Sequence, residues 1–283
     1  MSVPLKLAGF AVILALVFGA SLALGDAVGP QRDGSVDAGE GHGAMAAMEG
    51  EEHGAAQPVR GLAVSDGGLT LELARAGAPQ GEEWRLRFRI AGPEGETVRD
   101  FDLEHTKRMH LLVVRRDLSG FQHLHPTQAG DGSWSVPLRL DAAGTYRVFA
   151  DFSHDGEART LADDLQVDGT VRSRPLPDPA PAVTVDGMRV RLDAAASHAG
   201  EEAELAFTVS RAGRPVAVED YLRAKGHLVA LREGDLAFLH VHPDEDRLRF
   251  TATFPSAGRY RLFLQFQVDG EVHTAAFTRE VGR

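Results

Sequence analysis

Short runs in which apolar and polar residues alternate recur between residues 61 and 167. The clearest runs are 69–73, 84–90, 109–114, 133–138, 145–152 and 161–167. Clusters of glycine, proline and aspartate separate them, as at 92–95 and 130–132. Because successive side chains of a strand point to opposite faces, this pattern predicts short strands with one buried face. No window has a convincing helical periodicity, so the pattern indicates an all-β sandwich.

The second half of the chain repeats the first. Residues 68–73 match 187–192, and residues 143–149 match 257–263, with an offset that drifts by only a few residues. A tandem duplication predicts two domains of one fold. We therefore expect two immunoglobulin-like β-sandwich domains. Their expected boundaries are 59–167 for the first, 168–182 for a stiff proline-rich linker, and 183–283 for the second.

One tyrosine in each repeat follows an Ala-Gly turn near a late strand, Tyr146 in the first and Tyr260 in the second. This placement resembles the tyrosine corner of immunoglobulin-like sandwiches, in which the hydroxyl bonds to upstream backbone. We expect both tyrosines to determine the fold. Trp134 and Phe121 are expected to be core residues.

The N-terminus predicts export. An uncharged apolar run spans residues 7–25 and follows Lys6. It is longer than the roughly 7–15 residues of a usual signal-peptide core and close to the roughly 20 that cross a bilayer. Its unbroken length favours a membrane anchor at 1–25, whereas Ala-Leu-Gly at 23–25 offers a cleavage site and a secreted product. Both interpretations place the rest of the chain outside the cytoplasm, in the cell envelope.

Residues 26–58 are rich in glycine, alanine and acidic residues and lack aromatic residues. Such a segment cannot bury enough apolar surface to fold alone, so we expect a disordered acidic tether. Its potential metal ligands are His42, Met45, Met48, Glu49 and His53. Imidazole and thioether groups suit copper, with methionine favouring Cu(I). Two interpretations remain: a tether only, or a tether that also captures metal weakly.

Composition excludes several classes of function. A net charge of −11 argues against nucleic acid and against electrostatic docking on anionic lipid. The chain has no cysteine, so any metal must use histidine, methionine, carboxylate or backbone oxygen. No nucleophile elbow and no glycine-rich phosphate loop is present, so we expect no enzymatic activity.

The most informative duplication is a histidine hairpin. Residues 109–126 begin Met-His and end Phe-Gln-His-Leu-His-Pro, and residues 226–243 begin Gly-His and end Phe-Leu-His-Val-His-Pro. The two histidines of each His-x-His share a face of the strand, and the hairpin brings the opening histidine beside them. The candidate metal ligands are His110, His123 and His125 in the first repeat, and His227, His240 and His242 in the second.

Two interpretations of these histidines stay open. Three imidazoles on adjacent strands suit a metal, copper first and zinc second, with one site in each repeat or one shared site. Asp102 and Asp220 precede the first histidine and could supply a carboxylate or an outer hydrogen-bond partner. Met109 corresponds to Gly226, so it cannot be an obligatory ligand in both copies. Alternatively, the histidines only hold a strand end, and the protein is an envelope module that binds a partner protein.

The two hairpins, with Ala-Gly-Thr-Tyr-Arg-Val-Phe at 143–149, resemble a family of exported actinobacterial proteins labelled secreted or heavy-metal-associated. The similarity covers roughly residues 60–283. It implies tandem immunoglobulin-like domains in the cell envelope, loosely akin to YtkA-like and CopC-like modules. CopC-like proteins bind copper partly through a histidine at the mature N-terminus. Here the segment after Gly25 begins Asp26-Ala27, so that feature is missing.

Overall fold

The computed structural model describes residues 59–104, 106–241 and 247–283. Within these ranges the chain forms β-strands and no α-helix, which confirms the all-β prediction. The predicted anchor at 1–25 and the tether at 26–58, with its histidines and methionines, lie outside the described residues. In the described part of the chain, no helix has the length and apolarity needed to span a bilayer.

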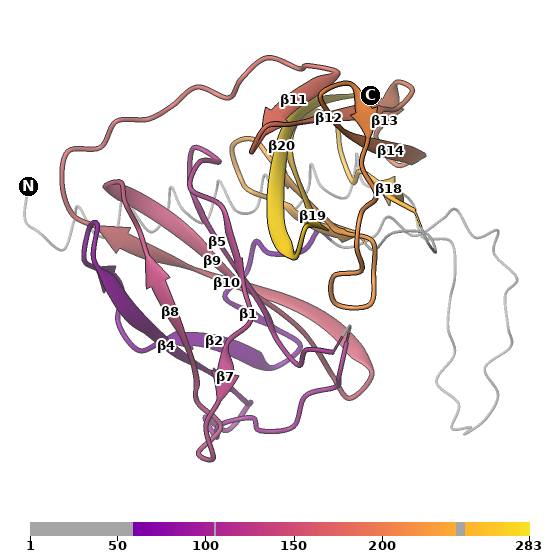
Figure 1. The fold of residues 1–283 in the computed structure, drawn as a ribbon. Coiled ribbons are helices and arrows are strands. Elements are labelled where there is room, and N and C mark those ends of the chain that lie inside the picture. Colours follow the sequence, from indigo (N-terminus) through magenta and orange to yellow (C-terminus); the bar gives the residue numbers. More distant parts are fainter. Residues whose placement is uncertain (1–58, 105, 242–246) are drawn as a thin grey trace, which may run out of the picture. The chain divides into compact units, whose positions relative to one another are not determined.

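Two sheets form the first repeat, drawn from indigo to pink in Figure 1. The first sheet contains, in spatial order, β1 (Ser65–Asp66), β2 (Leu69–Leu73), β4 (Glu83–Ala91), β8 (Trp134–Arg139) and β7 (Thr127–Gln128). The second sheet contains β3 (Gly77–Ala78), β10 (Glu157–Val167), β9 (Gly144–His154), β5 (His110–Arg115) and β6 (Gln122–Leu124). All pairings are antiparallel except that of β3 with β10.

The second repeat, drawn from salmon to yellow in Figure 1, has a similar arrangement. One sheet contains β11 (Ala182–Val185), β12 (Met188–Asp193), β14 (Glu202–Arg211) and β15 (Arg214–Pro215), with β18 (Arg249–Thr253) also paired to β14. The other contains β13 (Ser197–His198), β20 (Glu271–Gly282), β19 (Gly258–Val268), β16 (His227–Arg232) and β17 (Phe238–Val241). The predicted tandem immunoglobulin-like sandwiches are therefore present.

Each sandwich has its own apolar core between its two sheets. Trp134 stacks on Phe88 in the first core, with ring centroids 6.4 Å apart, and Phe254 packs on Tyr260 at 4.9 Å in the second. Both tyrosine corners are formed: the hydroxyl of Tyr146 donates to Ala142 O at 2.9 Å, and that of Tyr260 donates to Ser256 O at 2.9 Å. The tyrosine prediction is confirmed.

A third apolar cluster lies where the two repeats meet. Strand β5 buries Leu111 and Val113 in its own core and Leu112 and Val114 in this cluster. Strand β16 does the same, since Leu228 and Ala230 face the second core while Val229 and Leu231 face the cluster. Burial of both faces explains why these two strands are continuous apolar runs, including the run at 109–114 that was expected to alternate. We call this cluster the inter-repeat cluster. Its buried members are Leu112, Val114, Leu118, Phe149, Ala162, Leu176, Val229, Leu231, Leu236, Phe238 and Phe263.

Aromatic pairs contribute to the inter-repeat cluster. Phe121 stacks on Phe263 of the second repeat with ring centroids 4.0 Å apart, and Phe149 stacks on Phe238 at 5.2 Å. Phe121, expected in a core, therefore packs between the repeats. The contacts also reach the linker, because Leu176 is 8% exposed within the cluster. The linker is thus docked on the repeats as well as connecting them.

The tips of the two histidine hairpins carry equivalent features. Leu118 and Leu236 both have φ of +63° and are both buried in the inter-repeat cluster. Each follows an aspartate that pairs with an arginine of the preceding strand: Asp117 with Arg115, and Asp235 with Arg232. The ion pair holds the tip in a shape that turns the leucine inward.

Candidate metal centre

The first hairpin places three histidines on one face. Strands β5 and β6 pair so that Leu112 lies opposite His123. Residues directly opposite in an antiparallel pair share a face, and so do residues two apart along a strand. His110, His123 and His125 therefore all project to the side of β5 that faces the second repeat. The alternation expected from the sequence produces this placement.

The three imidazoles are close enough to share one ion. One ligand nitrogen from each residue lies within 4.8 Å of the others, and His110 Nδ1 lies 3.0 Å from His123 Nε2. The ring centroids are 5.2 Å apart for His110 and His123, 5.1 Å for His110 and His125, and 4.9 Å for His123 and His125. Imidazoles that bind one metal at about 2.0–2.1 Å in near-tetrahedral geometry have ring centroids about 5 Å apart.

Two residues of the second repeat, His227 and Gln265, lie beside the three histidines. His227 is fully buried, and its ring centroid lies 6.4 Å from that of His110 and 6.1 Å from that of His123, about 1 Å farther than the three rings of the first repeat lie from one another. Gln265 of β19 lies opposite His227 in the strand register, and its Oε1 is 2.7 Å from His123 Nδ1. The cluster therefore draws on both repeats.

The hydrogen bonds define how His123 presents its nitrogens. Gln265 Nε2 donates to Thr274 Oγ1 at 3.3 Å, which directs Gln265 Oε1 toward His123. A carbonyl oxygen only accepts, so His123 carries its proton on Nδ1 and presents the lone pair of Nε2 toward His110. Metal-binding histidines typically donate their other N–H to a carbonyl or carboxylate in this way.

The structure describes less of the other two predicted ligands, His240 and His242. The backbone of His240 lies in β17 opposite Val229, as His123 lies opposite Leu112. Nothing further is described of the His240 side chain, and His242 lies outside the described residues.

Asp102 and Asp220, which could have supported the histidines, have other partners in the structure. Asp102 accepts a hydrogen bond from Gly156 N at 2.9 Å, and Asp220 pairs with Lys225 at 2.7 Å. Both carboxylates lie on the connection before the histidine strand, where backbone and lysine donors engage them. Gln265 takes the role expected of them.

Gln265 was missed because only a comparison of the two repeats marks it. Its counterpart in the first repeat is Asp151, since His110 pairs with Asp151 as His227 pairs with Gln265. Each bonds to a threonine on the next strand: Thr160 Oγ1 donates to Asp151 at 2.6 Å, as Thr274 accepts from Gln265. A polar residue in the middle of an apolar strand, present in both copies, was the available signal.

The donor set suits a borderline transition metal. Imidazole binds copper, zinc and nickel, and copper(II) binds most tightly at a given nitrogen site. Met109, next to His110, is 1% exposed and packs in the first core, so its thioether faces away from the cluster. Other described histidines have separate partners: His154 bonds to Asp100 O at 2.8 Å and His273 to Asp186 at 2.7 Å.

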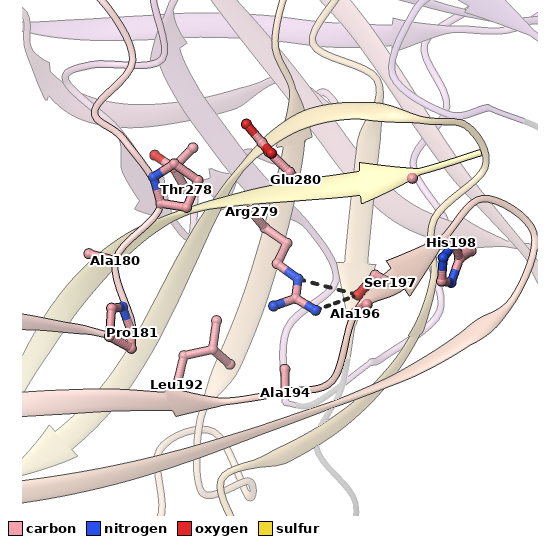
Figure 2. Close-up of a pocket in the computed structure, with 12 residues that line it drawn as sticks. Ala180, Pro181, Leu192, Ala194, Ala196, Ser197, His198, Thr278, Arg279 and Glu280 are labelled. Atoms are coloured by element: carbon pink, nitrogen blue, oxygen red, sulfur yellow. Dashed lines mark hydrogen bonds between the residues drawn. The ribbon is translucent and has the colours of Figure 1, made fainter.

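A cavity of about 430 Å³ elsewhere in the second repeat shares no lining residue with the histidine cluster. Figure 2 shows the Arg279 guanidinium in it, directed toward Ser197, with Glu280 directed away. Arg279 donates to Ser197 Oγ at 3.0 and 3.3 Å and also to Ala195 O. Burial lowers the pKa of Arg279. Through these bonds Arg279 connects β20 to residues 195–197, which is a structural role.

The fold and the cluster define a tandem β-sandwich protein with a histidine cluster where its repeats meet. The chain belongs to the family described as a domain of unknown function, DUF8832, whose model matches residues 63–169 and 183–283. The family description carries no function, so the kinship with CopC-like and YtkA-like modules stays a prediction. No curated protein matches the chain.

The solved structures that match the chain share little of its sequence. The Escherichia coli adhesin FdeC is 16% identical, with 78% of this chain and 66% of that chain covered and a TM-score of 0.28. Salmonella alpha-2-macroglobulin is 14% identical, with 79% and 15% covered and a TM-score of 0.28. InvD of Yersinia pseudotuberculosis is 12% identical, with 76% and 57% covered and a TM-score of 0.25. The chain spans less than two thirds of each, and at these TM-scores no function transfers to it.

Proposed function

We propose that this protein binds a transition metal outside the cytoplasm, copper in preference to zinc, for metal homeostasis or delivery. One observation carries the proposal: His110, His123 and His125 place ligand nitrogens within 4.8 Å of one another. Three imidazoles that converge in this way match the ligand set of a transition-metal site, which favours a metal over a purely structural role.

The outer contacts support the same assignment. His123 donates to the carbonyl oxygen of Gln265, which raises the basicity of the opposite nitrogen and fixes the ring. The cluster is also largely shielded from water, with His110 3% and His123 9% exposed. Shielding favours retention of a bound ion over exchange with solvent ligands.

The proposed location rests on the apolar run at 7–25, which exports the remainder of the chain whether or not it is cleaved. No catalytic role is proposed, because no nucleophile with an adjacent base was found in the sequence. The protein would therefore hold or pass on a metal ion.

Calorimetric titration of the untagged full chain with Cu(II), Cu(I) and Zn(II) tests the proposal. We expect Cu(II) to bind more tightly than Zn(II), and the double variant His123→Ala, His125→Ala to lose at least roughly tenfold in affinity. His154→Ala is the matched control, since His154 bonds to Asp100 O away from the cluster.

The competing role, an envelope module with structural histidines, predicts a different result. Under that role the double variant is less stable than the parent with or without metal. Under the metal role, added metal raises the melting temperature of the parent and leaves that of the double variant unchanged. Metal binding that is identical in the parent and the double variant would refute the proposed site.

A further inference from the structure

Gln265 is a buried polar residue in an otherwise apolar contact between the repeats. It is 8% exposed and lies on β19 two residues from Phe263, a member of the inter-repeat cluster. Burial of an amide costs free energy unless its polar atoms are hydrogen-bonded. Both are used here: Oε1 accepts from His123, and Nε2 donates to Thr274. Of these two partners, His123 belongs to the other repeat.

His227 is held in a similarly defined way. Its Nε2 lies 3.2 Å from the carbonyl oxygen of Tyr221, so Nε2 carries the proton and Nδ1 carries the lone pair. Tyr221 also packs edge-on against the ring, with centroids 5.5 Å apart. The result is an oriented imidazole beside His110 and His123, on the strand of the second repeat that corresponds to β5.

We infer that the second repeat completes the metal centre of the first, with Gln265 as the positioning residue of His123 and His227 as an added ligand. This inference rests on the proposed function. On this inference the chain has one metal centre, shared by both repeats, and not two independent centres. Gln265 does not touch the ion; it acts by fixing the tautomer and the ring plane of His123.

Sharing has a thermodynamic consequence. A metal held by residues of both repeats binds the docked arrangement in preference to any separated one, so it stabilises the contact between them. Conversely, changes at the contact that displace Gln265 or His227 lower metal affinity without altering the first repeat. The apolar inter-repeat cluster and the metal centre are therefore coupled.

The test compares Gln265→Leu, Gln265→Glu, His227→Ala and Gln267→Leu in the full chain. Gln267 lies on the same face of the same strand but bonds to Glu219 at 2.9 Å, so it is the matched control. We expect Gln265→Leu to lower Cu(II) affinity roughly 10–100-fold and His227→Ala to lower it by at least as much. Gln265→Glu keeps an acceptor for His123, so its Cu(II) affinity should stay close to that of the parent. Gln267→Leu should also leave the Cu(II) affinity unchanged.

A second readout needs no metal. Long-range ¹H–¹⁵N spectra distinguish histidine tautomers, and His123 should be protonated on Nδ1 in the parent and in Gln265→Glu but not uniformly so in Gln265→Leu. If Gln265→Leu fails to fold, Thr274→Val removes the contact that orients the amide and should give a smaller effect of the same kind.

The outcomes separate the two claims. A parent chain that binds no metal overturns the proposed function and this inference with it. A parent that binds metal, with Gln265→Leu and His227→Ala equal to Gln267→Leu, overturns the inference alone. Two equivalents of metal, one lost in His123→Ala, His125→Ala and the other in His240→Ala, His242→Ala, would likewise overturn the shared centre.

Discussion

His123 Nδ1 and Gln265 Oε1 lie 2.7 Å apart although 142 positions separate the two residues along the chain. The bond joins the repeat that carries the histidine triad to a residue of the other repeat. The repeats meet through these particular sheets because β5 and β16 each present one face to their own core and one to the other repeat. The candidate centre lies at the polar margin of that contact.

The carboxyl group of Asp117, at the hairpin tip of the first repeat, should make the free energy of unfolding depend on pH in the acidic range. Burial alone would raise the pKa of Asp117, but hydrogen bonds from Arg115, Ser119 and the backbone of Arg174 outweigh it and hold the pKa well below its usual range. A carboxyl whose folded pKa is depressed stabilises the fold above its unfolded pKa, about 3.9. That contribution should be lost as the pH falls below about 4 and through the folded pKa.

The variant Asp117→Asn checks this contribution directly. It leaves the Arg115 guanidinium, whose side chain is 5% exposed, without its carboxylate, so we expect a loss of about 3 kcal/mol at pH 7. The equivalent change Asp235→Asn affects a carboxylate that is 40% exposed and should cost less than about 1 kcal/mol. Denaturant unfolding at pH 7 measures both, and equal losses would refute the account of the tip.

Leu118 combines a left-handed backbone with a buried side chain. We expect Leu118→Ala to cost about 2–4 kcal/mol, because it opens a space in the inter-repeat cluster. Leu118→Gly should be no worse, since glycine avoids the strain of about 1 kcal/mol that alanine keeps at φ of +63°. At Leu112, in strand β5, the order should reverse and glycine should be the less stable variant. The same order at both positions would contradict the backbone assignment.

Gly61 tests how the segment before the first strand is held. Its N–H donates to Thr160 O at 3.3 Å, and a Cβ at this position would approach Phe149 and Phe238 to 2.7 Å. We expect Gly61→Ala to cost about 2–4 kcal/mol, from a φ of +73° and from crowding in a packed contact.

Gly81→Ala is the control, because Gly81 has φ of +72° with no atom within 4 Å of the added carbon. It should show only the backbone cost of about 1–2 kcal/mol. Thermal unfolding of the two variants separates crowding from backbone strain. Equal destabilisation would mean that the segment is not packed between the two phenylalanines.

Much of the fold could be predicted from period-two alternation and from the duplication. The runs at 69–73 and 84–90 became β2 and β4, and both tyrosine corners formed. The hairpin register that brings His110, His123 and His125 together also follows from alternation. The contact between repeats could not be predicted, because an apolar strand buried on both faces gives the same pattern whichever partner covers it.

The outer partner of His123 could not be predicted for a related reason. Asp102 and Asp220 were chosen for nearness in sequence to the histidine strand, whereas Gln265 is near only in space. A single glutamine in a strand has no chemical signature that separates it from a surface residue. Its role depends on the packing of β19 against the other repeat, which sequence alone does not determine.

The most direct test of the central claim is the metal content of the full chain, untagged and passed through gel filtration after loading with Cu(II). We expect the parent to retain one equivalent of copper that is lost in the triple variant His110→Ala, His123→Ala, His125→Ala. The triple variant should also lose the imidazole nitrogen couplings that the electron paramagnetic resonance spectrum of the parent should show. A parent that retains no copper, or a triple variant that retains as much as the parent, would contradict the assignment of a metal centre to these histidines.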